Sequence, residues 1–238
     1  YIYSGWQTID GAKYYYDPVT HKPLTGTQVI DGTTYLFNMD GRLSTQVQGI
    51  DVSKYQSNIN WAQVKAAGVE FVIIRCGYRG YGSGALVEDS TYRRNIPGAI
   101  NAGLRVGVYF YSQAINEAEA VEEASMVLSL VSGYSLPLGV YYDTESVGGG
   151  RANALSAAER TACAVAFCEE MKAAGFGPGV YVYNDTGYNG YDLSRLQAYM
   201  LWCAGVGSYP YFYYAHTVWQ YSFRGAVPGI TGDCDRTM

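Results

Sequence analysis

Four acidic residues of this 238-residue chain lie in or next to short apolar segments of sequence. Asp51 lies in Gly49–Ser53, Asp143 and Glu145 close an apolar run that begins at Gly139, and Asp235 closes a segment that begins at Ile230. If these segments are strands of a βα barrel, their carboxyl ends meet at one face of it. We therefore expect the four carboxyl groups to gather in one site.

The spacing of Asp143 and Glu145 favours acid catalysis. Residues two apart on a strand point to the same side, so Tyr141, Asp143 and Glu145 are expected to project together. Adjacent carboxylates raise each other's proton affinity, and one of them can then stay protonated near neutral pH. A protonated carboxyl group is the general acid that cleavage of a glycosidic bond requires.

A structural role for these acidic residues is the simpler alternative. Acidic side chains at strand ends can cap the following helix or form ion pairs with arginines, here Arg75, Arg79 or Arg151. One such residue would fit that role. Four at the same barrel end favour a reactive site.

From residue 49 onward, short apolar segments alternate with helical patterns, which is typical of βα units around a parallel sheet. The expected strands lie near 49–53, 69–75, 104–111, 138–145, 179–183, 199–203, 217–221 and 229–235. The expected helices lie near 60–67, 90–102, 116–131, 155–174 and 193–198. This pattern predicts an α/β fold, an irregular TIM-like barrel of about eight strands and five helices over residues 46–238. A doubly wound sheet is the alternative.

Residues 1–45 contain two copies of one unit. The motif that begins Gly5-Trp6-Gln7-Thr8-Ile9-Asp10-Gly11 recurs 21 residues later, with Asp31-Gly32 at its turn. An Asp-Gly pair between two short strands predicts a β-hairpin, and a single hairpin is marginal in water, so the two should pack together. The aromatic residues that could bind a ligand here are Trp6, Tyr14, Tyr15, Tyr35 and Phe37.

These repeats resemble the cell-wall or choline-binding repeats of bacterial and phage wall enzymes. In that family, two tryptophans of each repeat form the aromatic cage around the ligand. The first cage position is Trp6 in the first copy and Thr27 in the second. The second cage position is Lys13 in the first copy and Thr34 in the second. A quaternary ammonium group needs several aromatic faces around it, which argues against choline as the ligand. Docking to other cell-wall polymers and a role as a spacer both remain open.

Composition excludes several classes of protein. A net charge of −5 with no basic block argues against a nucleic-acid partner. No apolar run approaches the roughly 18 residues of a membrane span. Five cysteines form no disulfide framework or metal knuckle, and the two histidines do not accompany a nucleophile motif. The chain begins at Tyr1 without signal-peptide features, so localisation has to follow from function.

The combined motifs of residues 49–235 resemble the glycoside hydrolase family 25 lysozymes. They are Gly49-Ile50-Asp51-Val52-Ser53-Lys54-Tyr55-Gln56 with Trp61, Phe71–Arg75, Asp143-Thr144-Glu145 and Trp219-Gln220-Tyr221. The resemblance implies an irregular βα barrel that hydrolyses the β-1,4 bond between N-acetylmuramic acid and N-acetylglucosamine in peptidoglycan. It also implies a secreted or phage-released monomer that acts outside the cell or in the cell wall, without a cofactor or metal.

By position, the resemblance assigns Glu145 as general acid, Asp143 as the neighbouring carboxylate, and Asp51 and Asp235 as the other two acidic residues. The sugar groove would be lined by Tyr55, Tyr111, Tyr141, Tyr183, Trp202 and Gln220. The sequence departs from the family pattern around Asp235, which is preceded by Cys234.

The spacing of the Asp143 and Glu145 pair bears on the mechanism. A carboxylate nucleophile lies about 5–5.5 Å from its acid partner. On a strand, the backbones of residues i and i+2 are about 6.5 Å apart, given a rise of roughly 3.3 Å per residue. This favours attack by the 2-acetamido oxygen of the substrate, with Asp143 orienting the amide, and leaves an inverting path open.

Three other functions fit parts of the sequence. The barrel could be an inactive wall-binding protein, although a site without activity has no physical reason to keep two mutually repelling carboxylates. It could be a chitinase-like enzyme or a glucosaminidase, although the longer DxxDxDxE motif is absent before Glu145. The four carboxylates could also hold Mg²⁺ or Ca²⁺ for metal-dependent hydrolysis.

Overall fold

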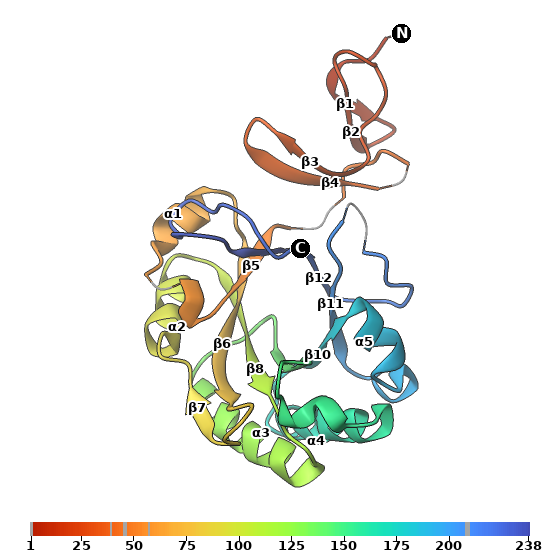
Figure 1. Cartoon of the computed structure of the whole chain (residues 1–238). Helices are drawn as coiled ribbons and strands as arrows, with labels where there is room; N and C mark the ends of the chain where they lie inside the picture. Colours follow the sequence, from red (N-terminus) through yellow and green to blue (C-terminus); the bar gives the residue numbers. More distant parts are fainter. Residues whose placement is uncertain (1, 39, 45–46, 57, 208–209) are drawn as a thin grey trace.

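The computed structural model describes residues 2–38, 40–44, 47–56, 58–207 and 210–238. Two small β-hairpins precede a barrel of strands and helices, and they lie beside the barrel end at which the chain terminates (Figure 1). The expected boundary between residues 45 and 46 lies outside the described residues. The first barrel strand begins at Gly49.

Both predicted hairpins form around their Asp-Gly turns. The first pairs β1 (Gly5–Ile9) with β2 (Ala12–Tyr16), and the second pairs β3 (Gly26–Ile30) with β4 (Thr33–Phe37). In both turns the Asp has a φ of 50° and the following Gly a φ near 80°. Two successive residues with positive φ form the type I′ turn that matches the strand twist.

The two hairpins pack on each other through aromatic rings. The ring of Trp6 meets Tyr35 of the second hairpin edge-on, with centroids 4.9 Å apart, and Tyr15 of its own hairpin at 5.2 Å. The Leu43 amide donates to the Lys13 carbonyl at 2.7 Å, and Arg42 donates to the Tyr14 hydroxyl at 3.2 Å. The repeats are therefore one unit.

The prediction that Phe37 presents its ring to a ligand is wrong. Its side chain is fully buried, whereas 39% of Trp6 is exposed. The strand alternation offers two faces per hairpin, and packing against Trp6 decides that Phe37 lies on the inner one. Phe37 therefore belongs to the core of the repeats.

Eight strands close the barrel. They are β5 (Gly49–Val52), β6 (Phe71–Arg79), β8 (Arg105–Ser112), β9 (Val140–Thr144), β10 (Pro178–Tyr183), β11 (Met200–Ala204), β12 (Val218–Ser222) and β13 (Asp235–Thr237). Neighbouring strands are parallel from β5 round to β12, and β13 closes the ring antiparallel to β12 and β5. A short strand, β7 (Leu86–Glu88), forms a hairpin with β6. The predicted barrel is confirmed, and the doubly wound sheet is wrong.

In the described residues, five α-helices and three 3₁₀ turns connect the strands. The helices are α1 (Trp61–Ala66), α2 (Tyr92–Asn101), α3 (Glu117–Val131), α4 (Ala157–Ala173) and α5 (Asn184–Asn189). The turns are η1 (Lys54–Gln56), η2 (Arg151–Ala154) and η3 (Leu193–Arg195). Ser156 and Glu159 start α4 with a capping box, as the sequence around them favours.

The helix expected near 193–198 is wrong, because that segment forms only η3. The fifth helix is α5, which follows β10 directly and contains poor helix formers. It forms there because Gly187 allows close packing: an added Cβ would lie 2.7 Å from the ring of Phe212. Tertiary packing therefore decides this element.

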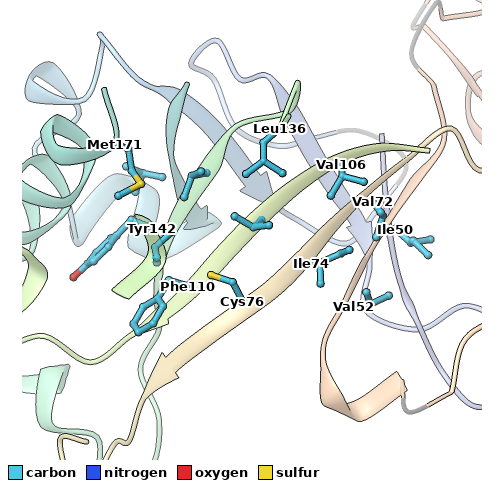
Figure 2. Packing of buried hydrophobic residues seen from close by; sticks show 14 of the residues in the cluster. Ile50, Val52, Val72, Ile74, Cys76, Val106, Phe110, Leu136, Tyr142 and Met171 are labelled. Atoms are coloured by element: carbon cyan, nitrogen blue, oxygen red, sulfur yellow. The ribbon is translucent and has the colours of Figure 1, made fainter. Parts of the chain in front are cut away.

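The hydrophobic core has two layers separated by the strands. The interior of the barrel is filled by Phe71, Ile73, Tyr141, Tyr181, Trp202, Ala204 and Val218. The layer between strands and helices includes Ile50, Val72, Ile74, Val106, Phe110 and Tyr142 (Figure 2). As predicted, Tyr141 and Tyr142 point to opposite faces of β9. All five cysteines are buried and free. In the described part of the chain, no helix has the length and apolarity needed to cross a membrane.

Candidate active site

The four predicted carboxylates gather at one end of the barrel. Asp51 is the third residue of β5, Asp143 the fourth of β9, and Glu145 follows β9 directly. Asp235 was expected to end a strand at 229–235, which is wrong, since it begins β13. Because β13 runs antiparallel to its neighbours, its first residue lies opposite Asp51 and reaches the same barrel end.

Two adjoining cavities meet at these carboxylates. The first lobe, about 350 Å³, and the second lobe, about 470 Å³, share Asp51, Tyr109, Asp143, Glu145 and Asp235 in their walls. The first lobe adds Tyr181, Tyr183, Trp202, Gln220 and Phe223. The second lobe extends over η1 and the ends of β6 and β8. An extended ligand lying through both lobes would pass directly over the carboxylates.

Most of the predicted groove residues lie in these walls. Tyr183, Trp202 and Gln220 line the first lobe, and Tyr55 and Tyr111 line the second. These five residues come from four strands and η1, so the barrel brings together residues that are far apart in the sequence.

Tyr141 is an exception among the predicted groove residues and lines neither lobe. Its side chain is fully buried in the barrel interior, with its ring 5.6 Å from that of Trp202. Its hydroxyl donates to the Met200 sulfur at 3.8 Å. Tyr141 points into the barrel as predicted, but it lies too deep to contact a ligand. It packs against the ring of Trp202, which does line the groove.

The sequence interpretation missed several groove residues. Tyr109 and Tyr181 precede the predicted Tyr111 and Tyr183 by two positions on the same strands, so the period-two rule could have found them. Lys54 and Arg75 lie within the motifs Gly49–Gln56 and Phe71–Arg75, although neither residue is among the predicted groove residues. Tyr78, Tyr81 and Phe223 lie outside these motifs and reach the groove from the end of β6 or from loops.

Asp51 and Asp235 form a hydrogen-bonded carboxyl pair held by Gln220. The Gln220 amide donates to Asp51 Oδ2 at 2.9 Å and to Asp235 Oδ2 at 3.3 Å, and its own oxygen accepts from the Tyr181 hydroxyl at 2.8 Å. Burial and then the charge of Asp235 raise the pKa of Asp51, whereas burial raises the pKa of Asp235 to about 6. Asp51 therefore keeps its proton to a higher pH than Asp235 does, and its carboxyl O–H donates a hydrogen bond to Asp235.

Asp143 and Glu145 differ in environment although they are two residues apart. Asp143 is only 4% exposed, and its Oδ1 has no hydrogen-bond partner. Burial, followed by the charges of Glu145 and Asp51, raises the pKa of Asp143 well above its ordinary value. The pKa of Glu145 is raised by burial and then by Asp235. Glu145 is partly exposed at the junction of the lobes, so it can hold a proton and deliver it to a ligand.

The loop after β9 is held by a buried glutamine that the sequence interpretation missed. Gln113 Nε2 donates to the Glu145 carbonyl at 3.1 Å, and its oxygen accepts from the Ala152 amide at 3.3 Å. The Gln113 side chain is fully buried. It fixes the backbone of Glu145 and thereby the position of its carboxyl group.

The alternative that these carboxylates serve only as partners of arginines is wrong. Arg75 pairs with Asp89 at 2.8 Å, Arg79 with Glu123 at 2.8 Å, and Arg151 with Glu119 at 2.8 Å. None of the ion pairs found in the described residues includes a carboxylate of the site. In the same residues, no group of three or more His, Cys, Asp or Glu side chains is placed to hold a metal ion.

A closed βα barrel with carboxyl groups between two aromatic-lined lobes at its strand ends has the architecture of a glycoside hydrolase. Comparison with known families is more specific. Residues 50–230 match the model of the glycosyl hydrolases family 25, and the chain belongs to this family.

Curated relatives include two lysozymes. The autolytic lysozyme of Clostridium acetobutylicum is 31% identical over 190 residues, which cover 79% of this chain and 54% of that protein. Lysozyme M1 of Streptomyces globisporus is 29% identical over 203 residues, which cover 80% of this chain and 66% of that protein. The chain thus spans between half and two thirds of the length of these relatives.

Solved structures share the fold. A bacterial lysozyme from Streptomyces coelicolor superposes with a TM-score of 0.66 at 27% identity, covering 82% of this chain and 93% of that one. The modular autolysin LytC of Streptococcus pneumoniae, solved with a synthetic peptidoglycan ligand, superposes with a TM-score of 0.71 at 23% identity. That match covers 100% of this chain and 67% of LytC.

Proposed function

We propose that this protein is a muramidase that hydrolyses the β-1,4 bond between N-acetylmuramic acid and N-acetylglucosamine in bacterial peptidoglycan. The observation that carries this proposal is the position of Glu145, a partly exposed carboxyl group with a raised pKa beside buried Asp143, where the two lobes meet. The lysozyme relatives and the peptidoglycan ligand of the pneumococcal autolysin support the same substrate. Digestion of purified peptidoglycan, with identification of the sugar at each new reducing end, tests it.

In the proposed reaction, Glu145 gives its proton to the leaving O4 of N-acetylglucosamine. The 2-acetamido oxygen of the muramic acid residue attacks C1 as the C1–O4 bond breaks, which forms an oxazolinium ion. Asp143 accepts a hydrogen bond from the amide N–H of that group and stabilises its positive charge, which uses its unpartnered Oδ1. The Glu145 carboxylate then takes a proton from water. The water oxygen attacks C1 and opens the oxazolinium ring, which restores the 2-acetamido group.

Asp51, Asp235 and Gln220 have a supporting electrostatic role in this proposal. Their hydrogen-bonded set holds negative charge beside Glu145, and the charge of Asp235 helps to keep the Glu145 carboxyl protonated. Trp202, Tyr109 and Tyr181 form an aromatic floor on which sugar rings can stack.

The charge of Asp235 predicts a specific change in the pH profile. In Asp235→Asn the negative charge is lost, so the pKa of Glu145 falls, and its proton is lost at a lower pH. The alkaline limb of kcat/KM, measured on soluble glycan strands between pH 4 and 9, should therefore move to lower pH. A limb that stays in place, or moves to higher pH, would show that Asp235 does not set the proton affinity of the acid.

We further propose that residues 1–45 dock the enzyme on the cell wall, with residues 46–238 as the catalytic barrel. The repeats precede the amino end of β5, whereas the carboxylates lie at the other end of the barrel, so a docked repeat leaves the groove open. Trp6 is the exposed member of the aromatic cluster and the residue that we expect to stack on wall polymer. The site of action is then the cell wall or the extracellular space, reached by secretion or phage release.

Trp6→Ala tests this docking role. Retention of the protein on purified walls should fall several-fold, because a stacking ring is lost, while turnover of soluble glycan strands stays unchanged. Wall binding should depend only weakly on salt, because the chain carries a net charge of −5 and anionic wall polymers do not attract it. Val29→Ala, at a residue 69% exposed on the second hairpin, is the control. Equal wall retention of both variants and the wild type would assign the repeats to a spacer.

A further inference from the structure

The two lobes of the groove differ sharply in charge. In the described residues, the walls of the first lobe include four carboxylic acids and no lysine, arginine or histidine. The second lobe shares the same acids and adds Lys54, Arg75 and Arg79. An anionic group on a ligand is therefore repelled in the first lobe and can be neutralised only in the second.

Two of the three cations are already engaged by protein groups. Arg79 donates to Glu123 at 2.8 Å and to Glu122 at 3.1 Å, and its side chain is 4% exposed. The Nε of Arg75 donates to Asp89 Oδ2 at 2.8 Å, and the buried Nη2 of the same guanidinium group has no hydrogen-bond partner. Arg75 therefore contributes positive potential from within the wall of the lobe.

Lys54 is the cation that a ligand can reach. Its ammonium group lies over the ring of Tyr78 at 5.0 Å and that of Tyr55 at 5.5 Å, and none of the ion pairs in the described residues includes it. Its backbone amide donates to Asp89 Oδ2 at 3.0 Å, which anchors η1. Tyr55 is 74% exposed, so the rings hold the ammonium group without closing the lobe.

We propose that the second lobe recognises the muramic acid residue by a carboxylate on its 3-O-substituent, which Lys54 binds and the Arg75 charge supports. This inference rests on the proposed function. N-acetylmuramic acid differs from N-acetylglucosamine by a 3-O-lactyl group, so a cation in one lobe distinguishes the two alternating sugars. Placing muramic acid in that lobe sets the register of the glycan strand and presents every second glycosidic bond to Glu145.

The carboxylate can belong to the lactyl group itself or to the peptide stem that extends from it. Three soluble substrates separate these sources: strands without stems, whose lactyl carboxylates are free; the same strands with that carboxyl converted to its methylamide; and strands that carry peptide stems. Affinities measured in the Glu145→Gln background, in which the strands stay intact, give a readout independent of hydrolysis.

Lys54→Met removes the charge and keeps an apolar stem on the tyrosine rings. Its Kd for a strand that carries the recognised carboxylate should rise roughly tenfold, as expected for the loss of one charge-assisted hydrogen bond. Lys54→Arg should restore the affinity. Lys65→Met, on α1 and outside both lobes, is the matched control and should bind as the parent does. A loss seen with free lactyl strands and not with methylamide strands assigns the lactyl carboxylate, and a loss confined to stem-bearing strands assigns the stem.

Equal Kd values for Lys54→Met and the parent on every carboxylate-bearing strand would overturn this inference, provided that their thermal unfolding temperatures agree. That result leaves the proposed activity intact, because wild-type enzyme would still release muramic acid ends. Failure of the proposed activity has a separate signature, namely no muramic acid ends from any strand with the wild type.

Discussion

Glu145→Gln is expected to lower kcat on peptidoglycan by about three orders of magnitude, within the range found for loss of a general acid. The amide has the shape of the carboxyl group but cannot give a proton to the leaving oxygen. The backbone of residue 145 should stay in place, because Gln113 donates its hydrogen bond to the backbone carbonyl of residue 145 and not to the side chain that is replaced. KM should change little, since the lost interaction acts mainly in the transition state. Steady-state kinetics on soluble glycan strands measures both constants.

The matched control for this prediction is Glu170→Gln. Glu170 lies near the end of α4, is exposed and lines neither lobe. Its variant should have wild-type kcat and KM. A Glu145→Gln enzyme that keeps more than about a tenth of wild-type kcat would remove Glu145 from the role of acid, since general acid catalysis contributes at least about a hundredfold.

Asp143→Asn is expected to lower kcat about a hundredfold and to stabilise the fold. The activity falls because the asparagine carries no negative charge to stabilise the positive charge of the oxazolinium ion. The stability rises because burial raises the pKa of Asp143, so its ionised form is unfavourable in the folded state, whereas the asparagine carries no charge. The gain should be on the order of 1 kcal/mol at neutral pH, since a tenfold rise in proton affinity on folding corresponds to about 1.4 kcal/mol.

The sign of this stability change depends on pH. A carboxyl group whose pKa is raised in the folded state binds its proton more tightly there than in the unfolded chain. The free energy of unfolding is therefore highest at low pH, and it falls as the pH rises from the unfolded pKa through the folded pKa. Asp143→Asn should therefore gain over the wild type as the pH rises above the ordinary carboxyl pKa of 3.8, and the difference should vanish below it. Thermal unfolding at pH 3.5 and pH 7 measures this. A variant less stable than the wild type at both pH values would show that Asp143 is a structural residue.

Local sequence rules predicted much of the fold. The two Asp-Gly pairs produce the φ values of type I′ turns, and the alternation along β9 places Tyr141 inside the barrel and Tyr142 against Phe167 of α4. The same alternation brings Asp143 to the groove, with Glu145 just beyond the strand. These features depend on neighbours within a few residues, so the sequence carries the information directly.

The features that the sequence did not reveal depend on distant partners. The segment that begins at Ile230 looks like a strand, but Gly229 packs against Asn60 at the start of α1, and the strand begins only at Asp235. Its antiparallel direction is set by pairing with Gly49–Asp51. The charge difference between the lobes likewise arises because η1 and β6 contribute to one lobe only.

The measurement that tests the central proposal most directly is mass spectrometry of the soluble products from purified peptidoglycan, with and without borohydride reduction. We predict that the wild type creates new reducing ends at N-acetylmuramic acid and that Glu145→Gln creates none. New ends at N-acetylglucosamine would contradict the proposed bond and indicate a glucosaminidase. Wild-type digests without new reducing ends of either sugar would contradict the hydrolase and leave a protein that only binds the wall.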